Sequence, residues 1–171
     1  VIAVDLVGNM PYMDEILEIA LDHGIKIIED AAESIGATYK NKQAGTFGDV
    51  GCYSFNATKL VQSGQGGMVV TDNELIYQRM KLLSHHGIDK SPESKYYWST
   101  IIGFNYNWSN IQAALALAQF RRIEEFINKK HEIFDWYVKY LSEIDGLKLN
   151  NNQSCVRPTY WLMVAIIPEI F

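Results

Sequence analysis

The stretch 48-GDVGCYSFNATK-59, continued by 64-GQGGMVVT-71, is the part of the chain around which the rest is organised. Residues 50–55 have the apolar character of a short strand that ends in polar, turn-forming residues, and residues 68–71 have that of a second strand. Lys59 follows just past the first strand. A lysine on a tight turn beside buried strands is partly desolvated, so its amine can act as a nucleophile towards carbonyls. A solvated turn lysine is the alternative that Lys59 by itself leaves open.

A carboxylate at a second strand end favours the reactive interpretation. Asp30 follows the apolar run of residues 25–28, and open α/β sheets gather ligand-binding groups at the carboxyl ends of their parallel strands. Enzymes that use pyridoxal phosphate (PLP) need a lysine that forms a Schiff base with the aldehyde. They also need an acid that keeps the pyridine nitrogen protonated as an electron sink. Lys59 and Asp30 can supply these two groups.

Two longer runs carry a resemblance to a known family. They are EDAAESIGATYKNKQAGTFGDVGCYSFNATKLVQSGQGGMVVT, residues 29–71, and GFNYNWSNIQAALALAQ, residues 103–119. Both resemble the DegT-type sugar aminotransferases, which are fold-type I PLP enzymes, and the likeness extends along most of the chain. The resemblance implies that Lys59 forms the Schiff base and that Asp30 is the partner of the pyridinium nitrogen.

The resemblance also implies three further cofactor contacts within the first run. Ser54 is expected to contact the cofactor phosphate, and Ala32 to pack against the cofactor ring. Glu33 stands where relatives often carry Gln or His, and it is expected near the phenolic oxygen of the cofactor.

The second run adds an expectation about assembly. From the residues alone, Asn105 is a turn former before a helix. The resemblance implies instead that Asn105 reaches the cofactor phosphate of a neighbouring subunit, so that a homodimer shares its active sites. Asn107 departs from the family pattern, because relatives commonly have Arg there. The loss of a guanidinium removes a fixed charge, which affects the expected binding of substrate rather than the chemistry at Lys59.

The order of apolar segments predicts an α/β fold. A strand at residues 1–6, a helix at 13–23 and a strand at 25–29 form a strand–helix–strand unit with a right-handed crossover. Ile16, Leu17, Ala20 and Leu21 share one face of that helix. Short glycine-marked segments at 34–39 and 43–49 are typical of a small hairpin. With the resemblance, the fold class is the central fragment of a fold-type I PLP-dependent transferase, with a mixed, mostly parallel sheet and flanking helices.

The second half of the chain predicts longer helices and a second domain. A helix is expected at residues 73–84, and an irregular loop near the active-site mouth at 88–103. Ser109 opens a long capped helix with a kink near Lys129 and Lys130. Strands are expected at 147–149 and 160–167.

These elements define two expected domains. Residues 1–145 form part of the large PLP-binding domain with its long closing helix, and residues 146–171 begin a smaller C-terminal α/β domain. Relatives carry further residues at both ends, including an upstream segment that helps hold the cofactor phosphate. The chain is therefore expected to be a fragment that binds PLP poorly and is inactive alone.

Composition excludes several classes of function. The chain has 171 residues, 48% of them hydrophobic, a net charge of −5 and no basic run, so nucleic acid is not an expected partner. No apolar run reaches the ~20 residues of a membrane span. Cys52 and Cys155 fit a reducing cytoplasm. His85 and His86 have no further ligands at metal-binding spacing, so no metal is expected.

The resulting functional expectation is a PLP-dependent aminotransferase. It would transfer an amino group, with glutamate as donor, to a nucleotide-linked keto sugar in the biosynthesis of cell-surface polysaccharide or other glycans. Lys59 argues against the dehydratase branch of the superfamily, whose members replace this lysine. A non-catalytic α/β scaffold or regulatory domain is the alternative, and the presence of Asp30 and Lys59 disfavours it. No Gly-x-Gly-x-x-Gly follows the first strand, which argues against a Rossmann dehydrogenase.

Overall fold

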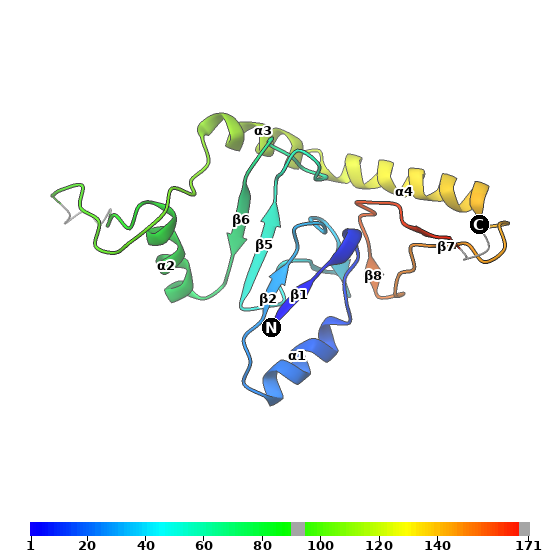
Figure 1. Ribbon diagram of the computed structural model, residues 1–171, viewed down its shortest axis with the longest axis horizontal. Helices are drawn as coiled ribbons and strands as arrows, with labels where there is room; N and C mark the ends of the chain where they lie inside the picture. Colours follow the sequence, from blue (N-terminus) through cyan, green and yellow to red (C-terminus); the bar gives the residue numbers. More distant parts are fainter. Residues whose placement is uncertain (90–94, 168–171) are drawn as a thin grey trace.

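A four-stranded sheet with the order β1-β2-β5-β6 lies at the centre of the computed structural model, which describes residues 1–89 and 95–167 (Figure 1). Its strands are β1 (Ile2–Val4), β2 (Ile28–Asp30), β5 (Val50–Ser54) and β6 (Gly67–Val70). The first three are parallel, and β6 returns antiparallel beside β5. The mostly parallel sheet is therefore confirmed. The carboxyl ends of β1, β2 and β5 lie along one edge.

Helix α1 (Met13–Asp22) makes the crossover between β1 and β2. Ala20 packs with Ala3 and Ile27 in a small buried cluster, with Ile16 and Leu17 against it. Leu21, which shares this face in the sequence, is 82% exposed and does not pack against the cluster. The buried stripe of α1 ends one residue earlier.

The expected hairpin forms from β3 (Thr38–Tyr39) and β4 (Lys42–Gln43). A third strand, β8 (Val156–Arg157), pairs antiparallel with β3, which makes a sheet of order β4-β3-β8. The end of the chain thus contacts its first third directly. The division into domains at residues 145 and 146 stays a prediction.

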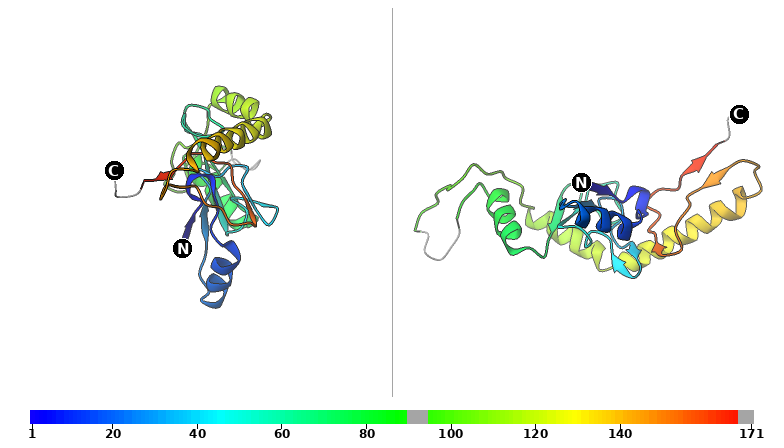
Figure 2. Two further views of the ribbon diagram at one scale, coloured as in Figure 1. Left: turned by 90° about the vertical axis from the view of Figure 1, so that its right-hand side faces the viewer. Right: turned by 90° about the horizontal axis from the view of Figure 1, so that it is seen from below.

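Helix α2 (Glu74–Ser84) begins at Asn73, whose side chain accepts hydrogen bonds from two backbone N–H groups of the first turn. A long irregular strip follows α2. Figure 2 shows this strip with α2 at one end of an elongated molecule and α4 with β7 and β9 at the other. None of the helices in residues 1–89 and 95–167 has both the length and the apolar character that a bilayer span requires.

Two helices occupy the place of the single long helix expected from the sequence. Helix α3 (Asn110–Phe120) begins with the capping box of Ser109 and Gln112, as predicted, and α4 (Ile123–Leu141) follows it. The break lies at Arg122, whose φ of −112° and ψ of 15° leave the helical range. The kink expected near Lys129 and Lys130 is wrong, because α4 continues through both residues.

The last strands are shorter than the sequence suggests. β7 (Lys148–Leu149) pairs antiparallel with β9 (Ala165–Ile166). Tyr160 has a φ of 48°, in the left-handed region that a strand does not accommodate. The strand expected from residue 160 therefore forms only at its far end.

Two acidic side chains are buried near the carboxyl ends of β1 and β2. Asp5 and Glu29 are both fully buried. Glu29 accepts hydrogen bonds from the backbone N–H groups of Gly45 and Phe47, at 2.6 and 2.7 Å. The hydroxyl of Ser34 donates to Asp5 Oδ2 at 2.7 Å. Burial raises the pKa of Asp5 to about 8; the Ser34 bond opposes the rise and the Glu29 carboxylate adds to it.

We expect Asp5 to make stability fall with rising pH. Its pKa is about 8 in the folded protein and ~3.9 in an unfolded chain. At pH values between these two pKa values, Asp5 is therefore protonated in the folded state and ionised in the unfolded state. This stabilisation is complete below pH ~4 and is lost as pH rises through ~8. The free energy of unfolding, measured with urea from pH 5 to 8, should fall more in the wild type than in Asp5→Asn.

Asp14→Asn is the matched control for this measurement. Asp14 is an exposed acid whose pKa is lowered, mainly by its hydrogen bond from Lys40. It stays ionised from pH 5 to 8, so this variant should keep the pH dependence of the wild type. Equal pH dependence of the wild type and Asp5→Asn would show that Asp5 is not the titrating group.

Candidate active site

A tight turn after β5 places Lys59 at the carboxyl edge of the sheet. Asn56 Oδ1 accepts hydrogen bonds from the backbone N–H and the hydroxyl of Thr58, both at 3.1 Å. The N–H of Lys59 donates to the Asn56 carbonyl at 3.0 Å. Such side-chain bonds to the backbone two residues on are typical of Asx turns. The sequence therefore specifies locally where the Lys59 side chain begins.

The amine of Lys59 lies between a carboxylate and an aromatic ring. The Lys59 side chain is 13% exposed, and Nζ is 3.7 Å from Glu33 Oε1. On its other side, Nζ is 4.1 Å from the centre of the Trp161 ring system. Trp161 Nε1 in turn donates to the Thr58 carbonyl at 2.9 Å. Lys59 is thus a largely buried amine in a defined position, and the solvated turn lysine is excluded.

Glu33 is anchored by the end of β1. Its Oε2 accepts the backbone N–H of Val7 at 2.8 Å. Val7 has a φ of 53°, a left-handed conformation that is strained for a β-branched residue. Such strain is frequent where a backbone group has to be aimed at a functional side chain. The ends of β1, β2 and β5 thereby contribute to one cluster.

Asp30 and Ser54 end the adjacent strands β2 and β5. Asp30 Oδ1 accepts the N–H of Ala32 at 3.1 Å. In the described part of the chain, Asp30 Oδ2 takes no hydrogen bond. The Ser54 hydroxyl accepts the N–H of Asn56 at 3.3 Å, and no described residue accepts its proton. Each of these two side chains therefore retains hydrogen-bonding capacity for a ligand.

These groups match the chemistry of pyridoxal phosphate. An amine suits its aldehyde, a carboxylate suits its protonated ring nitrogen, and a hydroxyl donor suits its phosphate. Lys59, Asp30 and Ser54 provide one of each along the same sheet edge, and Ala32 is half-buried between them in the chain. The residues present therefore fit this cofactor. The individual contacts to it stay predictions.

The sequence did not indicate the segment that closes the site. Residues 158–161, here called the strap, are fixed at successive positions. His131 Nε2 donates to the Pro158 carbonyl at 2.8 Å, and the N–H of Thr159 donates to the Gly8 carbonyl at 2.8 Å. The ring of Tyr160 stacks on Phe134 with centroids 3.9 Å apart. Lys130 Nζ donates to the Trp161 carbonyl at 2.9 Å.

Close approach to the strap requires glycine at position 8. Gly8 has a φ of 85°, and a Cβ there would lie 2.5 Å from Thr159 Oγ1. Trp161 and Thr58 are 103 residues apart in the chain, and no local pattern connects them. Only the fold shows that Trp161 belongs to the site.

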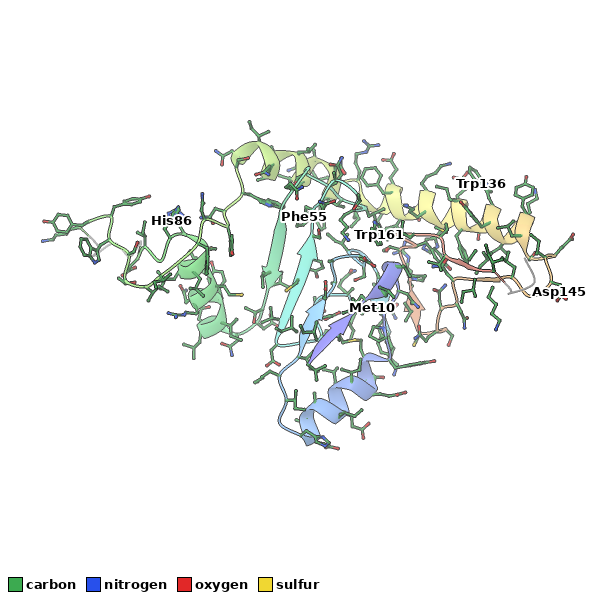
Figure 3. The ribbon with its side chains drawn as sticks, viewed as in Figure 1. Met10, Phe55, His86, Trp136, Asp145 and Trp161 are labelled. Carbon is green, nitrogen blue, oxygen red and sulfur yellow. The ribbon has the colours of Figure 1, made fainter. Side chains whose placement is uncertain are left out.

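Asn105 lies apart from this cluster within one protomer. It forms an isolated bridge with His85, and Figure 3 shows the neighbouring His86 far from Trp161. Asn107 Nδ2 lies 2.6 Å from His85 Nδ1, in the same region. The described part of the 88–103 strip therefore does not border Lys59 of its own protomer, where it was expected; residues 90–94 lie outside the described ranges. The role of Asn105 across a dimer stays a prediction.

Comparison with known proteins shows the family. The family model described as the DegT/DnrJ/EryC1/StrS aminotransferase family matches residues 1–170. A GDP-perosamine synthase of Caulobacter vibrioides is 40% identical over 170 residues, which are 99% of this chain and 45% of that protein. A UDP-4-amino-4,6-dideoxy-N-acetyl-β-L-altrosamine transaminase of Campylobacter jejuni is 31% identical over 174 residues, 98% of this chain and 45% of that protein.

A solved structure agrees with the fold. The Escherichia coli GDP-4-keto-6-deoxy-D-mannose-3-dehydratase with bound hydrated PLP has a TM-score of 0.87 and 26% identity, covering 99% of this chain and 46% of that one. The chain thus spans less than half the length of the proteins that it matches.

Proposed function

The chain belongs to the DegT/DnrJ/EryC1/StrS aminotransferase family, and we propose that the protein is a PLP-dependent aminotransferase that acts on a nucleotide-linked keto sugar. The observation that carries the proposal is the placement of the Lys59 amine and the Asp30 carboxylate on the carboxyl ends of adjacent parallel strands. Relatives that are named for GDP- and UDP-linked sugars support the substrate class. We further propose glutamate as the amino donor, and glycan biosynthesis in the cytoplasm as the setting; the two free cysteines fit that compartment.

The side chains of the site divide the work of such a reaction. When bound, pyridoxal phosphate supplies an aldehyde that condenses with amines and a ring that accepts an electron pair. Lys59 would hold the cofactor through Nζ, and the same amine, when free, would accept the proton that the α-carbon of the donor loses. Asp30, oriented by the Ala32 N–H, would keep a proton at the ring nitrogen. Trp161, the last residue of the strap, covers Lys59 and so limits the access of water to the reacting groups.

The residues of the site argue against two alternatives. A non-catalytic scaffold would need neither an amine nor a carboxylate at this sheet edge, and this chain has both. The family resemblance implies that some dehydratases of the superfamily replace the lysine, and this chain retains Lys59. We therefore assign amino transfer rather than dehydration. We also propose residues 1–145 as part of the large domain and 146–171 as the beginning of the small one.

Reduction with borohydride should locate the cofactor on Lys59. After loading of the full protein with PLP, reduction and peptide mapping by mass spectrometry should place the pyridoxyl label on Lys59. Asp30→Asn should still take the label, because the shape of the side chain is kept. Its rate of amino transfer should fall by ~10²-fold or more, as for the loss of one key electrostatic group. Label on another lysine, or normal turnover in Asp30→Asn, would contradict these roles.

The position of Asn105 supports a homodimer with shared sites, which we propose as the active form. Asn105 follows the irregular strip of residues 88–103 and bridges to His85, whose neighbour His86 lies at the end of the molecule away from Trp161 (Figure 3). Large exposed side chains flank it in the sequence, including Ile102 at 90% and Tyr106 at 72% exposure. Apolar side chains this exposed favour contact with a partner surface. A second subunit could place the strip against the Lys59 site.

Mixed dimers test this arrangement. We expect Lys59→Ala and Asn105→Ala homodimers each to be impaired. A heterodimer of the two would contain one doubly altered site and one intact site. Random mixing in equal amounts should therefore restore about a quarter of wild-type amino transfer. Absence of recovery, with heterodimers demonstrated by native mass spectrometry, would mean that each site belongs to one subunit.

A further inference from the structure

The strap has a backbone conformation that needs support from outside. Tyr160 has a φ of 48°, in the left-handed region that residues with a side chain rarely adopt. Such a conformation costs free energy and persists only where the surrounding contacts enforce it. One of these contacts is the stack of the Tyr160 ring on Phe134 of helix α4. Because the backbone of Tyr160 sets the direction in which the chain continues, the contacts that enforce its φ also position Trp161.

Helix α4 holds the strap on both sides of Tyr160. Before it, His131 Nε2 donates to the Pro158 carbonyl at 2.8 Å. After it, Lys130 Nζ donates to the Trp161 carbonyl at 2.9 Å. The ring of His131 also meets the ring of Tyr160 edge to face, with centroids 5.0 Å apart. Two neighbouring residues of one helix thus fix the backbone at both ends of the strained residue.

The cover over Lys59 depends on this path of the strap. Lys59 Nζ lies 4.1 Å from the centre of the Trp161 ring system, and the Lys59 side chain is only 13% exposed. The indole N–H donates to the Thr58 carbonyl, but this bond is exposed, so water competes for both of its groups. The hydrogen bonds from α4 are partly buried and are therefore the stronger restraint on Trp161.

We propose that Lys130 and His131 are positioning residues that act through the strap to keep Trp161 over the Lys59 amine. The inference rests on the proposed function, because it says what shields the reactive amine of that site from water. The assigned effect of both side chains is on the strap backbone and not on the reacting atoms. Their removal should therefore uncover Lys59 while the turn that carries Lys59 stays in place.

Acetylation of Lys59 in the full, cofactor-free protein measures this cover. The rate of reaction with N-hydroxysuccinimide acetate is followed by peptide mass spectrometry. Lys130→Met, which keeps the aliphatic stem, should raise the rate by about tenfold, the scale of one hydrogen bond from a charged group. Lys130→Arg should return the rate close to that of the wild type, because it keeps a cationic donor. His131→Leu should also raise the rate, and His131→Gln, which keeps an N–H donor, should reverse that rise.

Three controls separate positioning from a general loosening of the fold. Lys139→Met, an exposed site on the same helix, should leave the acetylation rate of Lys59 unchanged. Trp161→Ala should raise the rate, and Lys130→Met added to Trp161→Ala should raise it no further, because both changes remove the same cover. Hydrogen exchange of the β5 backbone should stay as in the wild type in every variant.

Each result decides for or against the assignment. An unchanged rate in folded Lys130→Met and His131→Leu overturns it, and so does a double variant in which the effects of Lys130→Met and Trp161→Ala add. A rise that Lys130→Arg and His131→Gln do not reverse, or one with faster exchange throughout β5, would show a loss of packing alone and also overturns it. Acetylation needs no cofactor, amino donor or keto sugar. Failure of the proposed function would therefore leave these rates unaffected.

Discussion

Asp30 reaches the same sheet edge as Lys59 because β2 and β5 are parallel neighbours, with Asp30 opposite Cys52. This pairing depends on tight packing below the edge. A Cβ on Gly51 would lie 1.8 Å from the Gly45 carbonyl oxygen, so no larger residue fits there. The buried Glu29 accepts the Gly45 N–H and so joins this loop to β2. The candidate active site is therefore a consequence of one strand pairing and of the glycine and carboxylate that permit it.

The elements near this edge could be predicted because their signals are local. An apolar run followed by Asp30, and a strand followed by the Asn56 turn, need only a few neighbouring residues to be specified. The remaining features depend on distant contacts. Nothing near Trp161 indicates that its ring covers Lys59. The helix break at Arg122 interrupts an apolar pattern that continues through it in the sequence. The exposure of Leu21 depends on which part of helix α1 packs against the sheet.

The strap connects the site to the rest of the molecule. It joins the Gly8 turn after β1, the Thr58 turn after β5, and helix α4 through Lys130. A shift of α4 would therefore move Trp161 relative to Lys59. This geometry couples the packing of the C-terminal segment to the environment of the reactive amine, and it explains why a residue so late in the chain can belong to the site.

The central claim is that one bound cofactor contacts both strand ends at once. Diffraction from crystals of the full protein loaded with pyridoxal phosphate tests it most directly. The account predicts continuous density from Lys59 Nζ to the aldehyde carbon, and the ring nitrogen within hydrogen-bond distance of the Asp30 carboxylate, ~2.6–3.2 Å. A cofactor bound elsewhere, or a ring nitrogen that faces away from Asp30, would contradict it.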